Sequence, residues 1–170
     1  MVTDDDDAFA TMFRLRNYGQ TDKHVHAVEG FNSRLDELQA AFLKLKLGHL
    51  DAWNEKRRHL AWLYHQGLKE TPLTLPVECE YAYHVYHLYV VRAPRRDELM
   101  RFLAGEGITA LIHYPTPVHL QPAYRHLGYK AGDFPEAEKA ATEIVSLPLY
   151  PWLEEEKLAY VCDAIRGFYR

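Results

Sequence analysis

The stretch GFNSRLDELQAAFLKLKLGHLDAWNEKRRHLAWLYHQGL, residues 30–68, decides the fold. Apolar and aromatic side chains recur in it at steps of three and four residues, the spacing of one face of an α-helix. These positions are Leu35, Leu38, Phe42, Leu45, His49, Ala52, Trp53, Leu60, Leu63 and Tyr64. Ser33, three residues before Asp36, resembles a capping box with Asp in place of Glu, and predicts the helix start. The stripe runs to about Leu68, so it predicts one unusually long helix or two helices that meet near Gly48.

After this stretch the chain alternates between two kinds of segment. The expected strands, rich in Tyr, Val and Ile, are YAYHVYHLYVVR (81–92), ITALIHY (108–114) and SLPLYP (146–151). The expected helices are PRRDELMRFLAGEG (94–107), EAEKAATEIV (136–145) and EEEKLAYVCDAIRGFY (154–169). The predicted class is therefore α+β, in which a long helix accompanies a small sheet of about three strands with helices on one face.

The chain before the long helix has two parts. The segment DDDDAFATMFRLRNYG (4–19) predicts a short helix, because acidic residues in the first turn and Arg14 and Arg16 near the other end suit the helix dipole. Four consecutive aspartates cannot converge on a metal, since consecutive side chains fan out around a helix. Residues 20–31 are polar and mixed, and are expected to form a loop.

Composition excludes several classes of protein. The 170 residues suffice for one domain with a core, and the net charge of −4 argues against a nucleic-acid-binding module. No apolar run approaches the roughly 20 residues that span a bilayer, and the N-terminus does not resemble a signal peptide. Cys79 and Cys162 lie far apart in no metal-binding spacing, which is typical of free thiols in a cytosolic protein. We therefore expect a cytoplasmic protein.

The chain contains 10 histidines, but they do not predict a metal centre. His84 and His87 fall in an expected strand, where a spacing of three places them on opposite faces. His24 and His26 have no cysteine nearby, and no triplet of ligands suits a catalytic zinc. The sequence also lacks a Gly-x-Ser-x-Gly elbow, a Walker-type phosphate loop and a Gly-x-Gly-x-x-Gly motif.

The loop HYPTPVHLQPAY (113–124) is the remaining candidate for chemistry. His113, Tyr114 and His119 carry two imidazoles and a phenol on a segment that prolines stiffen, and such groups can exchange hydrogen bonds with a polyol. A surface loop whose aromatic residues cover the edge of the core would show the same residues. From the residues alone, both interpretations stay open.

Four segments, taken in order, resemble a known family. They are GFNSRLDELQAAFLKLKLGHLDAWNEKRR, YHVYHLYVVR, GITALIHYPTPVHLQPAY and SLPLYP. Together they resemble the C-terminal part of the DegT–StrS family of nucleotide-sugar aminotransferases, which depend on pyridoxal phosphate. The resemblance covers essentially the whole chain. It implies the small domain of a fold-type-I aminotransferase at residues 32–170, with residues 1–31 as a remnant of the large domain and an interface loop.

The resemblance also implies an activity and site residues. Such enzymes transfer an amino group from glutamate to a nucleotide-linked keto-sugar, and work as dimers with active sites at the subunit interface. Asn32 and Arg34 match the Gly-x-Asn-x-Arg turn, which implies contact with the cofactor phosphate. His113, Tyr114 and His119 match the loop that lines the sugar or donor pocket.

One departure from the family bears on catalysis. The family's cofactor lysine lies in a Ser-x-x-x-x-Lys-Asn type of motif, which no lysine of this chain matches. We therefore expect that this chain alone binds no cofactor and does not transaminate, because transamination needs an imine-forming amine. The alternative is a non-catalytic dimerisation or interaction domain derived from that family. Exposed apolar residues on the long helix would favour a homo-oligomer in either case.

Overall fold

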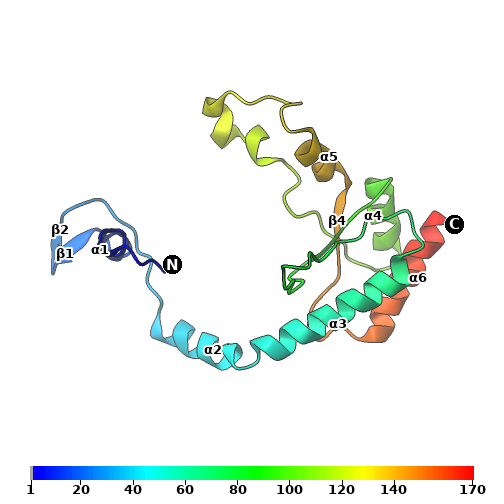
Figure 1. Cartoon of the computed structure of the whole chain (residues 1–170), viewed down its shortest axis with the longest axis horizontal. Helices are drawn as coiled ribbons and strands as arrows, with labels where there is room; N and C mark the ends of the chain where they lie inside the picture. The colour runs from blue at the N-terminus through cyan, green and yellow to red at the C-terminus, as the bar shows by residue number, and fades with distance from the viewer. Residues whose placement is uncertain (1) are drawn as a thin grey trace. The chain divides into compact units, whose positions relative to one another are not determined.

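The computed structural model of the chain describes residues 2–170 and divides into two units, Met1–His49 and Leu50–Arg170 (Figure 1). Unit 1 contains the helices α1 (Asp6–Leu15) and α2 (Glu37–Leu47) and the strands β1 (Gln20–Asp22) and β2 (Val25–His26). Unit 2 contains the helices α3 (Leu50–Leu68), α4 (Arg96–Gly105), α5 (Pro135–Glu143) and α6 (Glu155–Tyr169), the strands β3 (Tyr89–Arg92) and β4 (Ile144–Leu147), and the 3₁₀ helices η1 (Val118–Leu120) and η2 (Pro122–Leu127). The predicted α+β class is confirmed. No helix among the described residues is long and apolar enough to cross a membrane.

The long apolar stripe forms two helices. α2 ends at Leu47 and α3 begins at Leu50, so the version of the prediction with a break near Gly48 is confirmed. The predicted capping box is wrong, because α2 begins only at Glu37. Its N-cap is Asp36, and no side chain caps the helix there. Residues 33–36 are therefore a non-helical lead-in between the Asn32 turn and the helix.

Unit 1 is held together mainly by backbone hydrogen bonds at the end of α1. Asp5 caps that helix by accepting from the amide of Ala8 at 2.9 Å. Beyond the helix, the amide of Phe31 donates to Leu15 O at 2.7 Å, and the amide of Ser33 donates to Arg16 O at 2.9 Å. The turn that carries Asn32 is thus fixed against the C-terminal end of α1.

The expected loop at residues 20–31 contains a short hairpin, so that prediction is wrong. β1 and β2 pair antiparallel around a tight turn, in which His24 has a φ of 67° and the amide of Lys23 donates to Asp22 Oδ1. Most residues of both strands are exposed. Such strands show no alternation of apolar and polar residues, and that alternation is the signal on which strand prediction depends.

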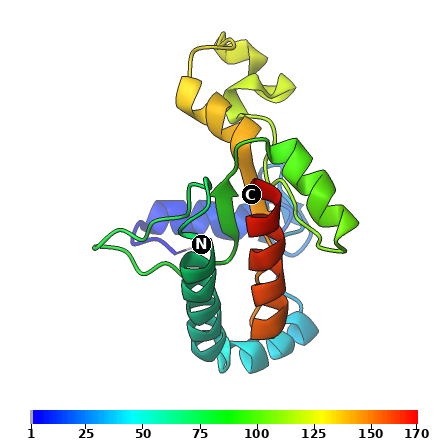
Figure 2. The same ribbon diagram turned by 90° about the vertical axis from the view of Figure 1, so that its right-hand side faces the viewer.

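Unit 2 has a single core between its strands and helices. α3 packs along α6, and α4 packs against both β4 and α6; Figure 2 shows α3 and α6 side by side. The side chains that are fully buried are Tyr64, Leu68, Tyr89, Val91, Leu99, Leu103, Val145 and Ile165. The two tyrosines stack with ring centroids 4.8 Å apart, and burial raises the pKa of both hydroxyls. Tyr64 donates its hydroxyl to Pro148 O at 2.8 Å, so its polar end is satisfied within the core.

The sheet of unit 2 is smaller than expected. β3 and β4 pair antiparallel, with Tyr89 opposite Leu147 and Arg92 opposite Ile144. The third expected strand, at residues 108–114, is reduced to one bridge between Leu111 and Ser146. A further bridge joins Thr74 to Arg92 at the other edge, so the sheet has two strands flanked by single bridges.

Only the end of the expected strand 81–92 is a strand, because side chains of α3 take up the backbone groups of its first part. Arg58 donates to Glu78 with both terminal nitrogens, at 2.6 and 3.1 Å, and to His84 O at 2.6 Å. Arg57 donates to Val85 O at 3.2 Å. His84 lies outside any strand, so the expected strand geometry for the histidine pair does not apply.

Candidate functional site

The sequence-predicted residues His113 and Tyr114 lie where the chain leaves the edge of the sheet. The bridge between Leu111 and Ser146 brings this segment beside β4, and His113 Nδ1 forms a hydrogen bond with Ser146 Oγ at 2.8 Å. Ser146 is 5% exposed, so it is a buried anchor for the imidazole. Tyr114 adopts a left-handed backbone conformation, with a φ of 62°, and its side chain is 85% exposed. An anchored imidazole therefore stands next to a phenol that is free to contact a ligand.

A cavity of about 660 Å³ lies beside Tyr114 and is here called the aromatic cavity. Six of the residues that line it are Tyr114, His119, Tyr124, Tyr129, Phe134 and Ile144. Phe134 contacts two of the other rings, since its centroid lies 4.7 Å from that of His119 and 5.1 Å from that of Tyr129. The segment PTPVHLQPAYRHLGYKAGDFP (115–135), which the sequence predicts to be a long loop, contains η1 and η2 and leads into α5. Its residues form one wall of a mainly apolar cavity.

His119 faces the protein interior. Its side chain is 8% exposed, and its Nε2 lies 3.0 Å from Glu138 Oε1 on α5. The same carboxylate accepts from the amides of Gly132 and Phe134, and these bonds together with His119 hold the pKa of Glu138 below its usual range. Both His119 and Tyr114 line the aromatic cavity, but only Tyr114 is exposed.

Asn32 and Arg34 lie together in unit 1. Arg34 Nε donates to Asn32 Oδ1 at 3.2 Å, and the Arg34 guanidinium lies over the ring of Tyr18, 5.5 Å from its centroid. A groove of about 650 Å³ in this unit is lined by Arg16, Ser33 and Arg34 and also by apolar side chains that include Phe9 and Phe13. Asn32 is not among its lining residues. The two guanidinium groups and the hydroxyl can bind an anion such as a phosphate, at one side of a largely apolar groove. The N-terminus of α2 is separated from Asn32 by residues 33–36 and begins with Asp36 and Glu37, so it does not reinforce this site.

Sequence reasoning missed three residues of these sites. Ser146 contacts His113, Glu138 contacts His119, and Arg16 lines the same groove as Arg34. Each belongs to another segment of the chain. Ser146 lies within the segment SLPLYP, but nothing in that segment indicates a partner for the serine. Glu138 looks like an ordinary acidic residue in the first turn of a helix.

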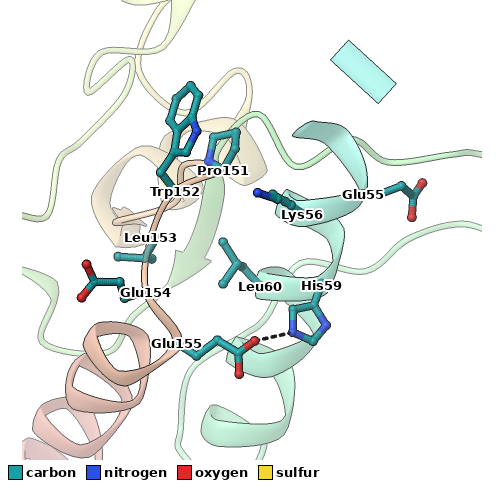
Figure 3. Close-up of a pocket in the computed structure, with 9 residues that line it drawn as sticks. All are labelled: Glu55, Lys56, His59, Leu60, Pro151, Trp152, Leu153, Glu154 and Glu155. Carbon is teal, nitrogen blue, oxygen red and sulfur yellow. Dashed lines mark hydrogen bonds and ion pairs between the residues drawn. The ribbon is translucent and has the colours of Figure 1, made fainter. Parts of the chain in front are cut away.

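Another cavity of unit 2, of about 670 Å³, lies between α3 and the start of α6 (Figure 3). Its lining includes Lys56, His59, Trp152 and Glu155, and the dashed line in Figure 3 marks the 2.9 Å contact between His59 Nε2 and Glu155 Oε1. Both partners are more than half exposed. None of the sequence-predicted residues lines this cavity, and no group of three His, Cys, Asp or Glu residues within 2–170 could hold a metal ion.

Solved structures define the class of protein to which this fold belongs. The structure of S. venezuelae DesV superposes with a TM-score of 0.91 at 45% identity, over 99% of this chain and 46% of that one. An aminotransferase from Brucella abortus gives a TM-score of 0.87 at 32% identity, over 98% of this chain and 45% of that one. The fold is therefore that of part of an aminotransferase. The sequence model of the DegT/DnrJ/EryC1/StrS aminotransferase family matches residues 1–166, and the chain belongs to that family.

Characterised relatives agree with this assignment. The chain is 49% identical over 168 residues to the erythromycin biosynthesis sensory transduction protein EryC1 of Saccharopolyspora erythraea, and covers 46% of it. It is 46% identical over 167 residues to dTDP-3-amino-3,4,6-trideoxy-alpha-D-glucose transaminase of Streptomyces venezuelae, and covers 44% of it. In both comparisons 98% of this chain is matched. The chain thus spans about half the length of the curated relatives it matches, and corresponds to their C-terminal part.

Proposed function

We propose that this chain forms the C-terminal part of an aminotransferase that transfers an amino group from glutamate to a nucleotide-linked keto-sugar. The observation that carries the proposal is the exposed Tyr114, which lines the aromatic cavity and follows His113, whose imidazole is anchored on Ser146 of β4. The anchored imidazole and the exposed hydroxyl can exchange hydrogen bonds with the hydroxyl groups of a sugar. His119 contributes to this site from within the cavity wall.

In the same proposal, unit 1 contacts the phosphate of pyridoxal 5′-phosphate. Arg34 orients the Asn32 side chain through Oδ1, which leaves the amide NH₂ group able to donate to an anion. Arg34 and Arg16 supply positive charge at the adjoining groove. The cofactor, when bound, supplies the electron sink that amino transfer needs. None of these 170 residues matches the family's lysine motif, so we propose that this chain alone holds no cofactor and is inactive.

The proposed domain division follows from the resemblance to the family. Residues 1–31 would belong with the large domain and an interface loop, and residues 32–170 would form the small domain with its leading helix. We also propose that the enzyme is a cytoplasmic homo-oligomer. The exposed apolar side chains of α2 support association, because Leu38, Phe42 and Leu45 are 75, 62 and 71% exposed.

A chimera tests the proposed activity. This chain would replace the matching part of the S. venezuelae transaminase, with which it shares 46% identity. We expect glutamate-dependent amino transfer to a dTDP-linked keto-sugar by the chimera and none by this chain alone.

Tyr114→Ala in the chimera should lower kcat/KM about tenfold or more, as expected when a substrate contact is lost. The control, Tyr81→Ala, removes a tyrosine that is 92% exposed and remote in sequence from the site. An inactive but folded chimera, or equal effects of both substitutions, would contradict the proposal.

The second candidate function is a non-catalytic interaction domain, which the exposed face of α2 favours. It would associate through that face without any need for the substrate site. Light scattering of the isolated chain and of a Leu38→Glu variant distinguishes the two. A dimer that the substitution dissociates, together with a chimera that lacks activity, would favour the interaction domain.

A further inference from the structure

The hydrogen bonds that join the segment between Tyr114 and Asp133 to α5 all end on one side chain, Glu138. The Glu138 carboxylate accepts from His119 Nε2 at 3.0 Å, from the amide of Gly132 at 2.8 and 3.0 Å, and from the amide of Phe134 at 3.3 Å. Within the part of the chain that the structure describes, the other hydrogen bonds of this segment join residues at most five positions apart. The carboxylate therefore ties together points of the segment that are far apart in sequence.

The groups that Glu138 holds are part of the cavity wall. His119 and Phe134 both line the aromatic cavity, as does Tyr114, and the Phe134 ring contacts those of His119 and Tyr129. His119 is almost buried, and the Glu138 side chain is 23% exposed. The amides of Gly132 and Phe134 belong to exposed residues, so His119 is the one nearly buried partner of this carboxylate. A charged acceptor makes each of these hydrogen bonds stronger than a neutral acceptor would. Loss of its charge would loosen two residues of the wall, His119 and Phe134, together with the turn at Gly132.

We propose that Glu138 is a positioning residue for substrate binding, which holds His119 and the 130–134 turn in place so that the wall beside Tyr114 keeps its shape. Glu138 is not expected to touch the substrate, and His119 acts mainly as its partner. The inference rests on the proposed function for the contact between Tyr114 and the substrate. The attachment of the segment by the carboxylate does not depend on that function.

The first experiment measures the attachment in this chain without substrate. Amide hydrogen exchange of Gly132 and Phe134 should become at least about tenfold faster in Glu138→Gln, because the amide that replaces the carboxylate accepts fewer hydrogen bonds. The matched control is Glu136→Gln, which removes an equal charge from the same helix turn at an exposed position. If exchange is unchanged in Glu138→Gln, or changes equally in both variants, the inference is wrong.

His119 provides a second test if Glu138→Gln does not fold. His119→Gln keeps a donor that can reach the carboxylate, whereas His119→Leu fills similar space without one. We expect His119→Leu to accelerate exchange at Phe134 and His119→Gln to restore most of the protection. Equal exchange in both variants would show that packing rather than the bond to Glu138 holds the segment, and would overturn the role of the pair.

The second experiment uses the active chimera and separates positioning from general damage. Glu138→Gln should raise KM for the keto-sugar about tenfold and change kcat less than about twofold, because binding geometry is altered and the reacting groups are not. Equal losses in kcat for Glu138→Gln and Glu136→Gln would contradict the positioning role. An inactive unsubstituted chimera would refute the proposed function, while the exchange measurements would still decide whether Glu138 holds the segment.

Discussion

The two units use similar helical patterns for different purposes. In α3 the apolar positions Leu60, Tyr64 and Leu68 are at most 4% exposed and form part of a core. In α2 the corresponding positions Leu38 and Phe42 are 75 and 62% exposed, and the helix buries no residue. A periodic apolar stripe thus establishes that a helix forms and which face is apolar. The stripe does not show whether another part of this chain packs against that apolar face.

The largest effect is expected when one leucine of each unit is replaced by alanine. Leu103→Ala, at a fully buried position in unit 2, should lower the free energy of unfolding by about 2–5 kcal/mol, because the truncation leaves a cavity. At protein concentrations low enough to keep the chain monomeric, Leu38→Ala in α2 should change it by less than about 0.5 kcal/mol, since the side chain is exposed in the single chain. Urea unfolding followed by circular dichroism measures both. A comparable loss in the two variants would mean that association covers α2 in solution, which their dependence on protein concentration would reveal.

A smaller effect, confined to unit 1, is expected for Gly19→Ala. Gly19 has a φ of 70°, and an added Cβ would lie 1.7 Å from Val28 O, so the hairpin cannot keep its geometry. We expect the NMR signals of residues 14–32 to change and those of unit 2 to persist, with little effect on the main unfolding transition. Gly105→Ala is the control, because its Cβ would meet nothing within 4 Å. Widespread changes throughout unit 2 would show that the conformation of the two units is coupled, although the buried core of the described residues lies in unit 2 alone.

The same contrast explains how far the sequence predicted the structure. The helices of unit 2 followed from their periodicity. Cys162 of α6 is buried, and burial raises the pKa of its thiol to about 11. The strand predicted at 81–92 was too long because Arg58 and Glu78 fix that backbone through side chains. The Tyr and Val residues of this segment favour a strand, but contacts with side chains of α3, which is separate in sequence, override that preference.

The candidate site was only partly accessible to sequence reasoning. His113 and Tyr114 were selected for their chemistry and position in a stiff loop, and the structure places them together at the sheet edge. Their supporting residues were not predicted, since Ser146 and Glu138 are 33 and 19 positions from the imidazoles that they contact. Such pairings depend on how the chain folds back, and no local pattern records them.

The smallest expected effect concerns the contact between His59 and Glu155, which links α3 to the start of α6. His59→Gln removes the imidazole from this 2.9 Å contact, but both side chains are more than half exposed, at 54 and 65%. Exposed pairs contribute about 0–1 kcal/mol, because solvent screens them and two side chains must be ordered.

We therefore expect a change in unfolding free energy below about 1 kcal/mol for His59→Gln, which urea unfolding in low and high salt can measure. Lys157→Gln, which breaks the exposed pair between the first turn of α6 and its N-cap residue Glu154, is the control. If His59→Gln lowers the unfolding free energy several times more than Lys157→Gln, the exposed contact between α3 and α6 stabilises unit 2 as a core contact would. The contrast between a stabilising buried core and a neutral exposed surface would then not hold at this position.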